Sequence, residues 1–483
     1  MGLEVVILFV ALSYVLGSPT PQPYDTIVIG LGSAGTTAAS TLARAGKRVL
    51  ALEAQDRIGG RVNTVPFGDG LVEVGAEWIH GTQHSRVYDL AIANNVTLMS
   101  QDSEFEAYRS DGTTSDAQLV KELMMYCLEV ADTPSEEQEA LGHYITRKLN
   151  VYLQEKHPKI LENQDFMDSF LKFMNFIINS YEATNDWNDV SAYTKYESLE
   201  GNQHMSWHRY GYKTFFDILL DKYNNGPGLP TLEIKLNTEV TKVTWPQDPK
   251  ENVIVTTKDG TTYTANNVIV TISLGVLKER YTTLFSPELP QKKITAIDKL
   301  TMGVLDKIIV SFEKRWWGDA LLDFFLLWRP EDLKDLPKDD WITKIGGISM
   351  PMGSNNTLTL WLNGDVAKLV ETLPEEDVKS KVVELLRRFM GHKYTIPEPT
   401  GMIRSTWFTN PFTRGSYTYD NLDVPNHPTA RSDLEAPLLD SAMKPRVLFA
   451  GEATNEKHFG TVHGASETGY REAMRLLPND SNV

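Results

Sequence analysis

The stretch that decides the fold runs from residue 25 to residue 61. It begins with Asp25-Thr-Ile-Val-Ile29, continues with Gly30-Leu-Gly32-Ser33-Ala-Gly35 and an alanine-rich segment, and ends with Val49-Leu-Ala-Leu-Glu53 and Arg57-Ile-Gly-Gly-Arg61. The two apolar runs predict strands joined by a glycine turn and a helix, in the order of a dinucleotide-binding unit. Since a helix N-terminus offers free N–H groups and partial positive charge, it would face the diphosphate.

The predicted cofactor residues have separate physical roles. Gly30 permits the tight turn, Gly32 lets the backbone approach the diphosphate, and Gly35 lets helix and strand pack closely. Ser33 lies in the same turn, and Glu53 would accept hydrogen bonds from a ribose hydroxyl. Glycines at this spacing often form an ordinary turn, so the strand, helix and acid in register are what favour a cofactor site.

The extension from Arg57 to Arg61 indicates which dinucleotide is bound. Nicotinamide enzymes do not need such an extension. A tightly held FAD does, because its longer diphosphate and ribitol must be held along their length. We therefore expect FAD, with Arg61 among its contacts.

The segment resembles the start of a flavin-containing amine oxidase. The string Glu73-Val-Gly-Ala-Glu-Trp78-Ile-His80-Gly81 is similar to that of the polyamine oxidase or spermine oxidase branch of the family. The likeness spans nearly the whole mature chain. It continues through Val268-Ile-Val-Thr-Ile-Ser-Leu-Gly275-Val-Leu-Lys278, Met302-Gly303 to Lys307, Pro411-Phe-Thr-Arg-Gly415-Ser-Tyr417-Thr-Tyr419 and Leu448-Phe-Ala-Gly451-Glu452-Ala-Thr454.

The resemblance implies an α/β protein with a Rossmann-like FAD-binding domain built from discontinuous segments and an α+β substrate-binding domain. The pattern agrees: strands are expected at 232–243, 253–257, 268–272, 307–312 and 357–361, with Asp259-Gly260 as a hairpin turn. Helices are expected at 166–178 and 374–390. The predicted boundaries are a signal peptide at 1–17, the FAD-binding domain at 24–95, 229–285 and 421–483, and the substrate domain at 96–228 and 286–420.

Further cofactor residues follow from the resemblance alone. Glu452 is implied to contact the sugar-phosphate region of FAD, while Thr461 and Val462 lie by the flavin ring. Val240 is expected in the same site. Covalent attachment in the monoamine branch of the family needs a cysteine where this chain has Ser416, so we expect FAD to be held noncovalently.

The catalytic and substrate residues also come from the resemblance. Lys307 aligns with the lysine that holds a water against the flavin N5, and His80 aligns with a substrate-facing polar residue. Tyr417 would supply an aromatic wall for the amine, and Glu197 an acid for a distal ammonium, although a solvated loop is equally plausible there. The family often has His after Gly-Glu-Ala-Thr, where this chain has Asn455. No metal is expected.

The expected reaction is oxidation of spermine, spermidine or N-acetylated forms. A hydride moves from the carbon beside nitrogen to the flavin, the imine is hydrolysed to an aldehyde and a shorter amine, and O2 reoxidises the flavin to give H2O2. Two alternatives stay open. A secreted L-amino-acid oxidase would need an arginine for the substrate carboxylate, and a catalytically silent FAD-binding protein would be in keeping with the altered segment 455–459.

Composition and termini bear on the partners and the compartment. The net charge of −17 argues against nucleic acid, because there is no basic stripe to displace counterions from phosphates. An acidic surface concentrates cationic ligands, although it also simply confers solubility. The apolar run at 5–16 is too short to span a bilayer and predicts a signal peptide, with a buried N-terminal helix as the alternative. With the sequons at Asn95, Asn355 and Asn479, we expect a secreted or secretory-lumen glycoprotein without stable membrane insertion.

A single cysteine, Cys127, allows no intrachain disulfide. It lies in an apolar segment and is expected to be a buried structural thiol. The oligomeric state is not predicted.

Overall fold

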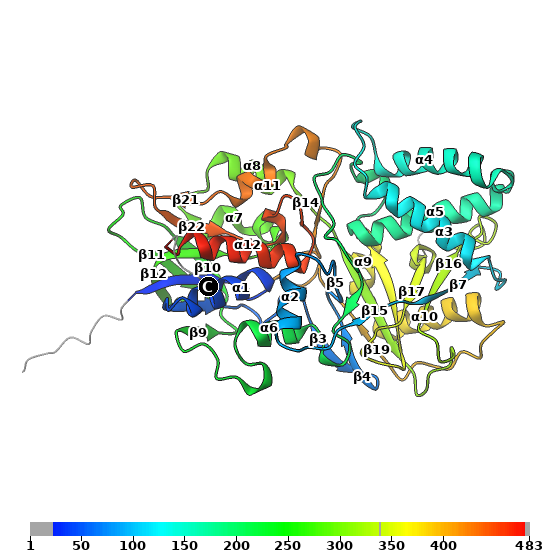
Figure 1. Cartoon of the computed structure of the whole chain (residues 1–483), viewed down its shortest axis with the longest axis horizontal. Helices are drawn as coiled ribbons and strands as arrows, with labels where there is room; N and C mark the ends of the chain where they lie inside the picture. Colours follow the sequence, from blue (N-terminus) through cyan, green and yellow to red (C-terminus); the bar gives the residue numbers. More distant parts are fainter. Residues whose placement is uncertain (1–22, 338–339, 479–483) are drawn as a thin grey trace, which may run out of the picture.

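The computed structural model describes residues 23–337 and 340–478. The predicted signal peptide and the sequon at Asn479 lie outside the described residues. Figure 1 shows two lobes side by side, one built on a nine-stranded sheet and the other on a six-stranded sheet. The α/β class predicted from the sequence is confirmed.

Within the nine-stranded sheet, the five adjacent strands β22, β12, β1, β2 and β9 run parallel to one another. β1 lies between β12 and β2, β9 continues beyond β2, and β22 pairs with the last residues of β12. Their carboxyl ends therefore meet at one edge, where parallel sheets bind ligands. The strands are β1 Tyr24–Ile29, β2 Val49–Leu52, β9 Leu232–Lys235, β10 Val240–Thr244, β11 Val253–Thr257, β12 Thr262–Val270, β13 Phe285–Ser286, β21 Leu438–Leu439 and β22 Pro445–Phe449.

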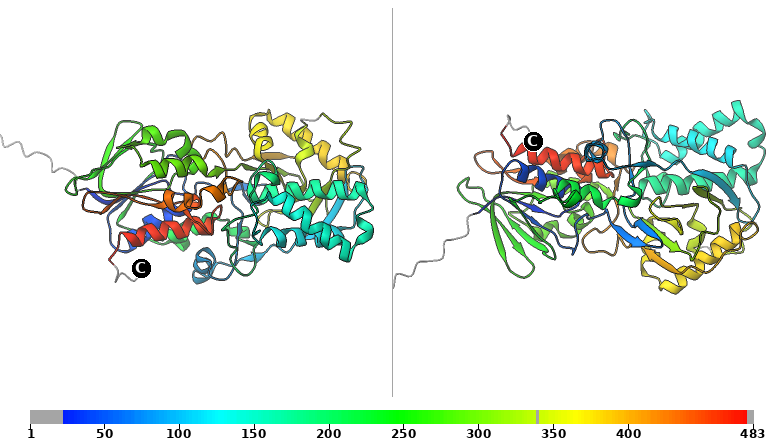
Figure 2. Two further views of the ribbon diagram at one scale, coloured as in Figure 1. Left: turned by 90° about the horizontal axis from the view of Figure 1, so that it is seen from above. Right: turned by 60° about the horizontal axis from the view of Figure 1, so that its bottom comes forward.

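Helices cover both faces of this sheet because its central strands are apolar on both sides. In β1, Val28 packs toward α1 (Ser33–Arg44) and α12 (Val462–Arg475), whereas Ile27 belongs to the opposite core with α7 (Leu274–Leu284), α8 (Gln291–Lys299) and α11 (Ala430–Glu435). α1 and α12 lie side by side (Figure 2). A Cβ at Gly469 would stand 2.0 Å from the Ala34 carbonyl oxygen, so this glycine allows the two helices to approach.

The six-stranded sheet has the order β19-β15-β18-β17-β16-β7. Phe325 faces α3 (Ala117–Ala131), α4 (Leu141–Lys156) and α5 (Gln164–Glu182), while its neighbour Phe324 joins the core with α9 (Gly364–Thr372) and α10 (Glu375–Met390). Figure 1 shows these two groups of helices on opposite sides of the sheet. The strands are β7 Glu104–Arg109, β15 Leu305–Ser311, β16 Leu322–Leu327, β17 Gly347–Ser349, β18 Thr357–Asn363 and β19 Gly401–Arg404.

Short elements occupy the junction between the two lobes (Figure 1). They include the hairpin of β3 and β4, the small sheet β5-β8-β6 and the pair β14-β20. Their bounds are β3 Thr64–Phe67, β4 Gly70–Glu73, β5 Trp78–Ile79, β6 Met99–Ser100, β8 Met205–Ser206, β14 Thr301–Met302, β20 Thr418–Tyr419, α2 Arg86–Ala93 and α6 Lys213–Leu219.

The predicted elements compare well with the observed ones. Asp259-Gly260 turns the β11-β12 hairpin, the helix expected at 166–178 lies within α5, and that at 374–390 is α10. Cys127 is fully buried, and burial raises the pKa of its thiol to about 12. The domain boundaries stay a prediction. Among the described residues no helix has both the length and the apolar character needed to cross a bilayer.

Candidate active site

The glycine turn lies at the carboxyl edge of the nine-stranded sheet, between β1 and α1. A Cβ at Gly35 would stand 1.9 Å from the Gly30 carbonyl oxygen, so the fold itself requires glycine there. At Gly32 the nearest atoms, from Gly59 and Gly60, would be 3.9 Å away. The protein's own packing would therefore accept a Cβ at Gly32 in ordinary van der Waals contact, so glycine is not required there by the fold and is instead suited to close approach of a ligand.

Glu53 lies immediately after β2, beside this turn. Its carboxylate accepts hydrogen bonds from Leu31 N at 2.7 Å and Gln55 N at 2.8 Å. Burial raises the pKa of Glu53, and these two bonds act against the rise. Thr238 N donates to the Glu53 carbonyl oxygen at 2.8 Å, so the start of β10 at Val240 lies close to Glu53.

The start of α12 joins the same site from the far end of the chain. Ser33 donates its hydroxyl hydrogen to the Val462 carbonyl oxygen at 2.8 Å. Thr461 is the N-cap of α12, because its Oγ1 accepts from Gly464 N at 2.9 Å. Two helix N-termini, at residues 33 and 462, thus lie next to each other.

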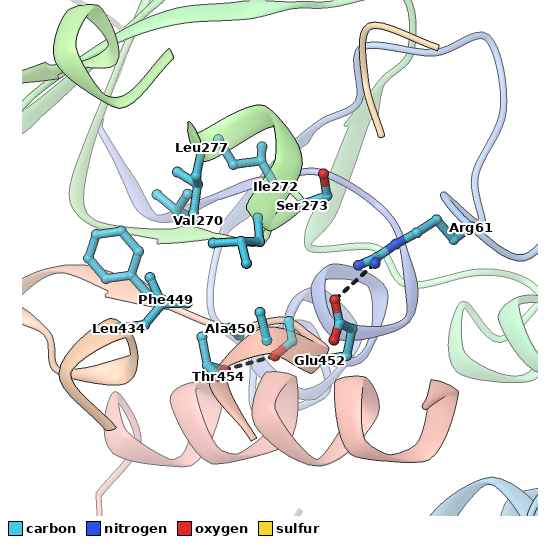
Figure 3. A pocket seen from close by; sticks show the side chains of 13 residues that line it. Arg61, Val270, Ile272, Ser273, Leu277, Leu434, Phe449, Ala450, Glu452 and Thr454 are labelled. Atoms are coloured by element: carbon cyan, nitrogen blue, oxygen red, sulfur yellow. Dashed lines mark hydrogen bonds and ion pairs between the residues drawn. The ribbon is translucent and has the colours of Figure 1, made fainter. Parts of the chain in front are cut away.

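Arg61 and Glu452 point toward one another across a pocket at the ends of β12 and β22 (Figure 3). Arg61 Nη1 donates to Glu452 Oε1 at 2.9 Å and to the Ser416 carbonyl oxygen at 2.6 Å. Glu452 Oε2 accepts from Thr418 Oγ1 at 2.7 Å and Gly460 N at 3.0 Å. Burial alone would raise the pKa of Glu452. The Arg61 guanidinium and these hydrogen bonds nevertheless hold that pKa below its usual value.

Lys307 lies on β15, opposite Trp361 of β18, and is buried. Its ammonium Nζ donates to Glu77 Oε2 at 2.7 Å and to the Glu73 carbonyl oxygen at 3.0 Å, and stands 4.5 Å from the Trp361 ring centroid. A strand lysine read from pattern alone is usually solvated. Glu77 was not predicted, although an acid inside the apolar string 74–79 was a signal that could have identified it.

His80 follows β5 and is held as a neutral imidazole. Burial, with a smaller contribution from nearby His204, lowers the pKa of His80 to about 4. His80 Nδ1 lies 2.7 Å from the Gln203 carbonyl oxygen, which can only accept. The Nδ1–H tautomer therefore follows, and Nε2 is left with a lone pair as an acceptor.

The two predicted substrate residues, Tyr417 and Glu197, have different surroundings in the structure. Tyr417 donates its hydroxyl hydrogen to the Ser180 carbonyl oxygen at 2.8 Å, at the end of α5. Glu197 is exposed and pairs with Lys457 at 2.8 Å. The acid near Tyr417 is instead Glu182, since burial and the negative charge of Glu182 are the two largest effects that raise the pKa of Tyr417.

Glu182 is the last residue of α5, and sequence reasoning missed it. Burial, and after it the negative charges of Asp420 and Asp132, raises the pKa of Glu182 to about 7, against the positive charge of Arg431. Among the described residues its carboxylate has no hydrogen-bond or ion-pair partner. An acid at the end of an otherwise apolar helix face was the available signal.

The altered segment after Glu452 forms its own polar network. Asn455 Nδ2 donates to Glu467 Oε2 at 2.8 Å, and His458 Nδ1 lies 2.7 Å from the same oxygen. No group of three or more His, Cys, Asp or Glu side chains suited to a metal ion occurs in the described part of the chain.

Comparisons with known proteins agree with this geometry. The family model "Flavin containing amine oxidoreductase" matches residues 33–477. The peroxisomal N(1)-acetyl-spermine/spermidine oxidase of Bos taurus is 28% identical over 93% of this chain and 94% of its own, and probable polyamine oxidase 5 of Arabidopsis thaliana is 28% identical over 93% and 97%. A redesigned putrescine oxidase is similar in structure, with a TM-score of 0.68, 17% identity and coverage of 94% and 99%.

The fold and site define a flavin-dependent oxidoreductase. The chain belongs to the flavin-containing amine oxidoreductase family, and its cofactor is FAD. The glycine at position 32, which the fold itself does not require, the two adjacent helix N-termini and the Glu53 carboxylate fit the diphosphate and ribose of this cofactor. When bound, FAD supplies the acceptor for the hydride removed from the amine.

Proposed function

We propose that this protein oxidises polyamines such as spermine, spermidine or their N-acetylated forms, and that it releases H2O2. The proposal is supported by the names of the bovine and Arabidopsis relatives. The observation that carries it is the carboxylate of Glu182, which has no hydrogen-bond or ion-pair partner among the described residues and whose charge, second to burial, raises the pKa of Tyr417 and Tyr196. A carboxylate without a direct partner favours an ammonium group.

The surroundings of Glu182 favour a substrate with a second positive charge. Burial, and after it the charge of Glu182, raises the pKa of Tyr196 to about 12, so the Tyr196 hydroxyl is within electrostatic range of the same carboxylate. Burial, and after it the negative charges of Asp420 and Asp132, raises the pKa of Glu182, against the positive charge of Arg431, so a further bound cation would relieve the remaining repulsion. An amino-acid substrate would need a free arginine, but Arg431 close by is paired with Asp420 at 2.8 Å.

The remaining residues would position and protect the reacting amine. His80 Nε2 can accept a hydrogen bond from the amine nitrogen, and Tyr417 limits the space around it. Lys307 is poised to hold a water, because its Nζ has three hydrogens and the described residues accept two of them. FAD is expected to be noncovalent, since Ser416 uses its hydroxyl within the fold, donating to the Leu305 carbonyl oxygen at 2.8 Å.

A peroxide assay tests the proposal against its alternatives. The purified holoenzyme is incubated with spermine, spermidine, N-acetylated polyamines and a set of L-amino acids. Peroxide from at least one polyamine and none from amino acids is expected. Peroxide from amino acids alone would identify an amino-acid oxidase, and peroxide from neither class would favour a silent FAD-binding protein.

Glu182→Gln is expected to lower kcat/KM for spermine about tenfold or more at pH 8, since a charge-assisted hydrogen bond contributes about 1.5–3 kcal/mol. The Glu182 carboxylate, with its pKa raised to about 7, is charged above that pH and neutral below it. The ratio of native to variant kcat/KM should therefore fall toward one between pH 8 and pH 6.

Glu197→Gln is the matched control, because Glu197 is exposed and paired with Lys457. It should leave kcat/KM within about twofold, as surface ion pairs contribute about 0–1 kcal/mol. An amine with an alkyl group in place of the distal nitrogen should be insensitive to Glu182→Gln. A large loss with Glu197→Gln and none with Glu182→Gln would return the distal subsite to the residue expected from the sequence.

We also propose that the protein is secreted and glycosylated. The proposal is supported by the apolar N-terminal run and by the exposure of Asn95 and Thr97. Asn355 is less suited to carry a glycan, because its Nδ2 donates to Asp69 at 3.2 Å and Thr357 of its sequon is fully buried. Expression in eukaryotic cells should give protein in the medium, starting near Ser18 and with glycan on Asn95, by peptide mass spectrometry. Retention in the cytosol with Met1 intact would contradict secretion.

A further inference from the structure

Lys307 and Glu77 form an ion pair that is closed off from solvent. The exposed fractions of their side chains are 4% and 3%, and Lys307 Nζ lies 2.7 Å from Glu77 Oε2. They come from distant segments of the chain, since Lys307 lies on β15 of the six-stranded sheet and Glu77 lies in the junction just before β5. Neither side chain can turn toward bulk water to lose its partner.

We infer that Glu77 is a positioning residue for Lys307: its carboxylate is the counter-charge that holds the Lys307 ammonium, and it directs the one Nζ hydrogen that no described residue accepts. The inference rests on the proposed role of Lys307 in holding a water at the flavin. It goes beyond that role, because the function of Lys307 would then require Glu77, an acid that does not contact the substrate amine in the proposed reaction.

The hydrogen bonds of Lys307 leave one Nζ hydrogen without an acceptor among the described residues. An ammonium has three hydrogens, and those of Lys307 are directed to Glu77 Oε2, to the Glu73 carbonyl oxygen and to one remaining direction. The hydrogen bonds of 2.7 Å to Glu77 and 3.0 Å to Glu73 set the directions of two hydrogens, and the tetrahedral geometry of Nζ then sets the direction of the third. The Trp361 ring, whose centroid is 4.5 Å from Nζ, favours the positive charge of the ammonium.

The ionisable groups around Lys307 also single out Glu77. A buried lysine without a counter-charge tends to lose its proton, because burial disfavours the charged form. The other charged or titratable groups facing the pair are the Glu73 carboxylate toward Lys307, and Asp323 and His204 toward Glu77. Burial raises the pKa of both Glu73 and Asp323 to about 7, and burial lowers the pKa of His204. Glu77 is the one acid in this group whose carboxylate contacts the ammonium.

Glu77→Gln removes the negative charge of the side chain and keeps nearly the same shape. The amide oxygen can still accept from Lys307, so the fold is kept while the counter-charge is lost. In a pH titration of the flavin absorption spectrum between pH 6 and pH 9, the variant should show a transition that the native enzyme lacks. The same transition should be absent from the double variant Lys307→Met/Glu77→Gln, which assigns it to Lys307.

Stopped-flow kinetics give the second readout. The rate of the half-reaction that is slowed in Lys307→Met should fall in Glu77→Gln above this transition toward the rate of Lys307→Met, while the native rate does not. Asp323→Asn, a neighbouring buried acid without contact to Lys307, is the control and should reproduce the native spectrum and profile. Glu77→Asp, which keeps the charge on a shorter side chain, should show no new transition.

The results of these variants distinguish a failure of the positioning role of Glu77 from a failure of the proposed role of Lys307. If Lys307→Met slows turnover but Glu77→Gln has the native pH profile and no new transition, the positioning role is wrong and the role of Lys307 stands. If Lys307→Met leaves the rates unchanged, the proposed role of Lys307 fails, and the inference fails with it. If Glu77→Gln is too unstable to purify, a new transition in Glu77→Asp would overturn the role of the charge, and its absence would support it.

Discussion

Lys307→Met is expected to slow at least one flavin half-reaction by about tenfold or more while FAD stays bound, each power of ten being about 1.4 kcal/mol of barrier. The reason is chemical, because methionine fills similar space but has no hydrogen to donate to a water. Stopped-flow measurements of anaerobic reduction by spermine and of reoxidation by O2 show which step depends on the amine. Unchanged rates and unchanged substrate affinity would make Lys307 a structural residue.

The buried pair adds a stability effect to this variant. Loss of Lys307 leaves the Glu77 carboxylate buried at 3% exposure without its partner, which costs about 3–5 kcal/mol. Thermal unfolding should therefore show a lower Tm for Lys307→Met, and Lys307→Met/Glu77→Gln should recover part of it. The double variant should stay slow. Recovery of both stability and rate would mean that the single variant was slow because its fold was damaged.

Gly32→Ala is expected to weaken FAD binding by at least about tenfold and to leave the apoprotein folded. The nearest protein atoms would be 3.9 Å from the new Cβ, so the fold accommodates it, and the backbone at Gly32 has an ordinary φ of −74°. The methyl group would occupy space needed for close approach of the diphosphate. Fluorescence titration of the apoprotein with FAD gives the Kd, and circular dichroism reports the fold.

Gly46→Ala should show the reverse pattern. A new Cβ at Gly46 would have no neighbour within 4 Å, but the φ of 76° at Gly46 is left-handed. Alanine there should cost about 1 kcal/mol of stability and leave the Kd for FAD unchanged. Equal FAD affinity in native and Gly32→Ala protein would contradict the assignment of the diphosphate to this turn.

Local sequence was enough to predict the strand, glycine turn and helix on which the proposed FAD site is built. Gly30, Gly35 and Glu53 lie in one continuous unit, where strand, turn and helix follow each other and neighbours in sequence are neighbours in space. The clash of 1.9 Å that a Cβ at Gly35 would make with Gly30 is the physical reason why the glycine spacing is informative. Strands and helices were predicted for the same reason, since their apolar periodicity is local.

The substrate half of the site depends on contacts between distant segments. Lys307 and Glu77 are 230 positions apart, and no periodicity connects them. The choice of Glu197 rested on a loop next to the expected site, but in the structure that acid pairs with Lys457, and Glu182 at the end of α5 lies near Tyr417 instead. Which acid is left without a partner is decided by packing, and a single sequence does not contain that information.

The most direct test of the central claim is the absorption spectrum of the oxidised holoenzyme after anaerobic addition of spermine or spermidine. Loss of the flavin absorption band near 450 nm shows hydride transfer from the substrate, and admission of O2 should restore the band with about one H2O2 formed for each flavin. The account predicts bleaching by at least one polyamine and none by L-amino acids. Bleaching by amino acids but by no polyamine, or a spectrum unchanged by both, would contradict it.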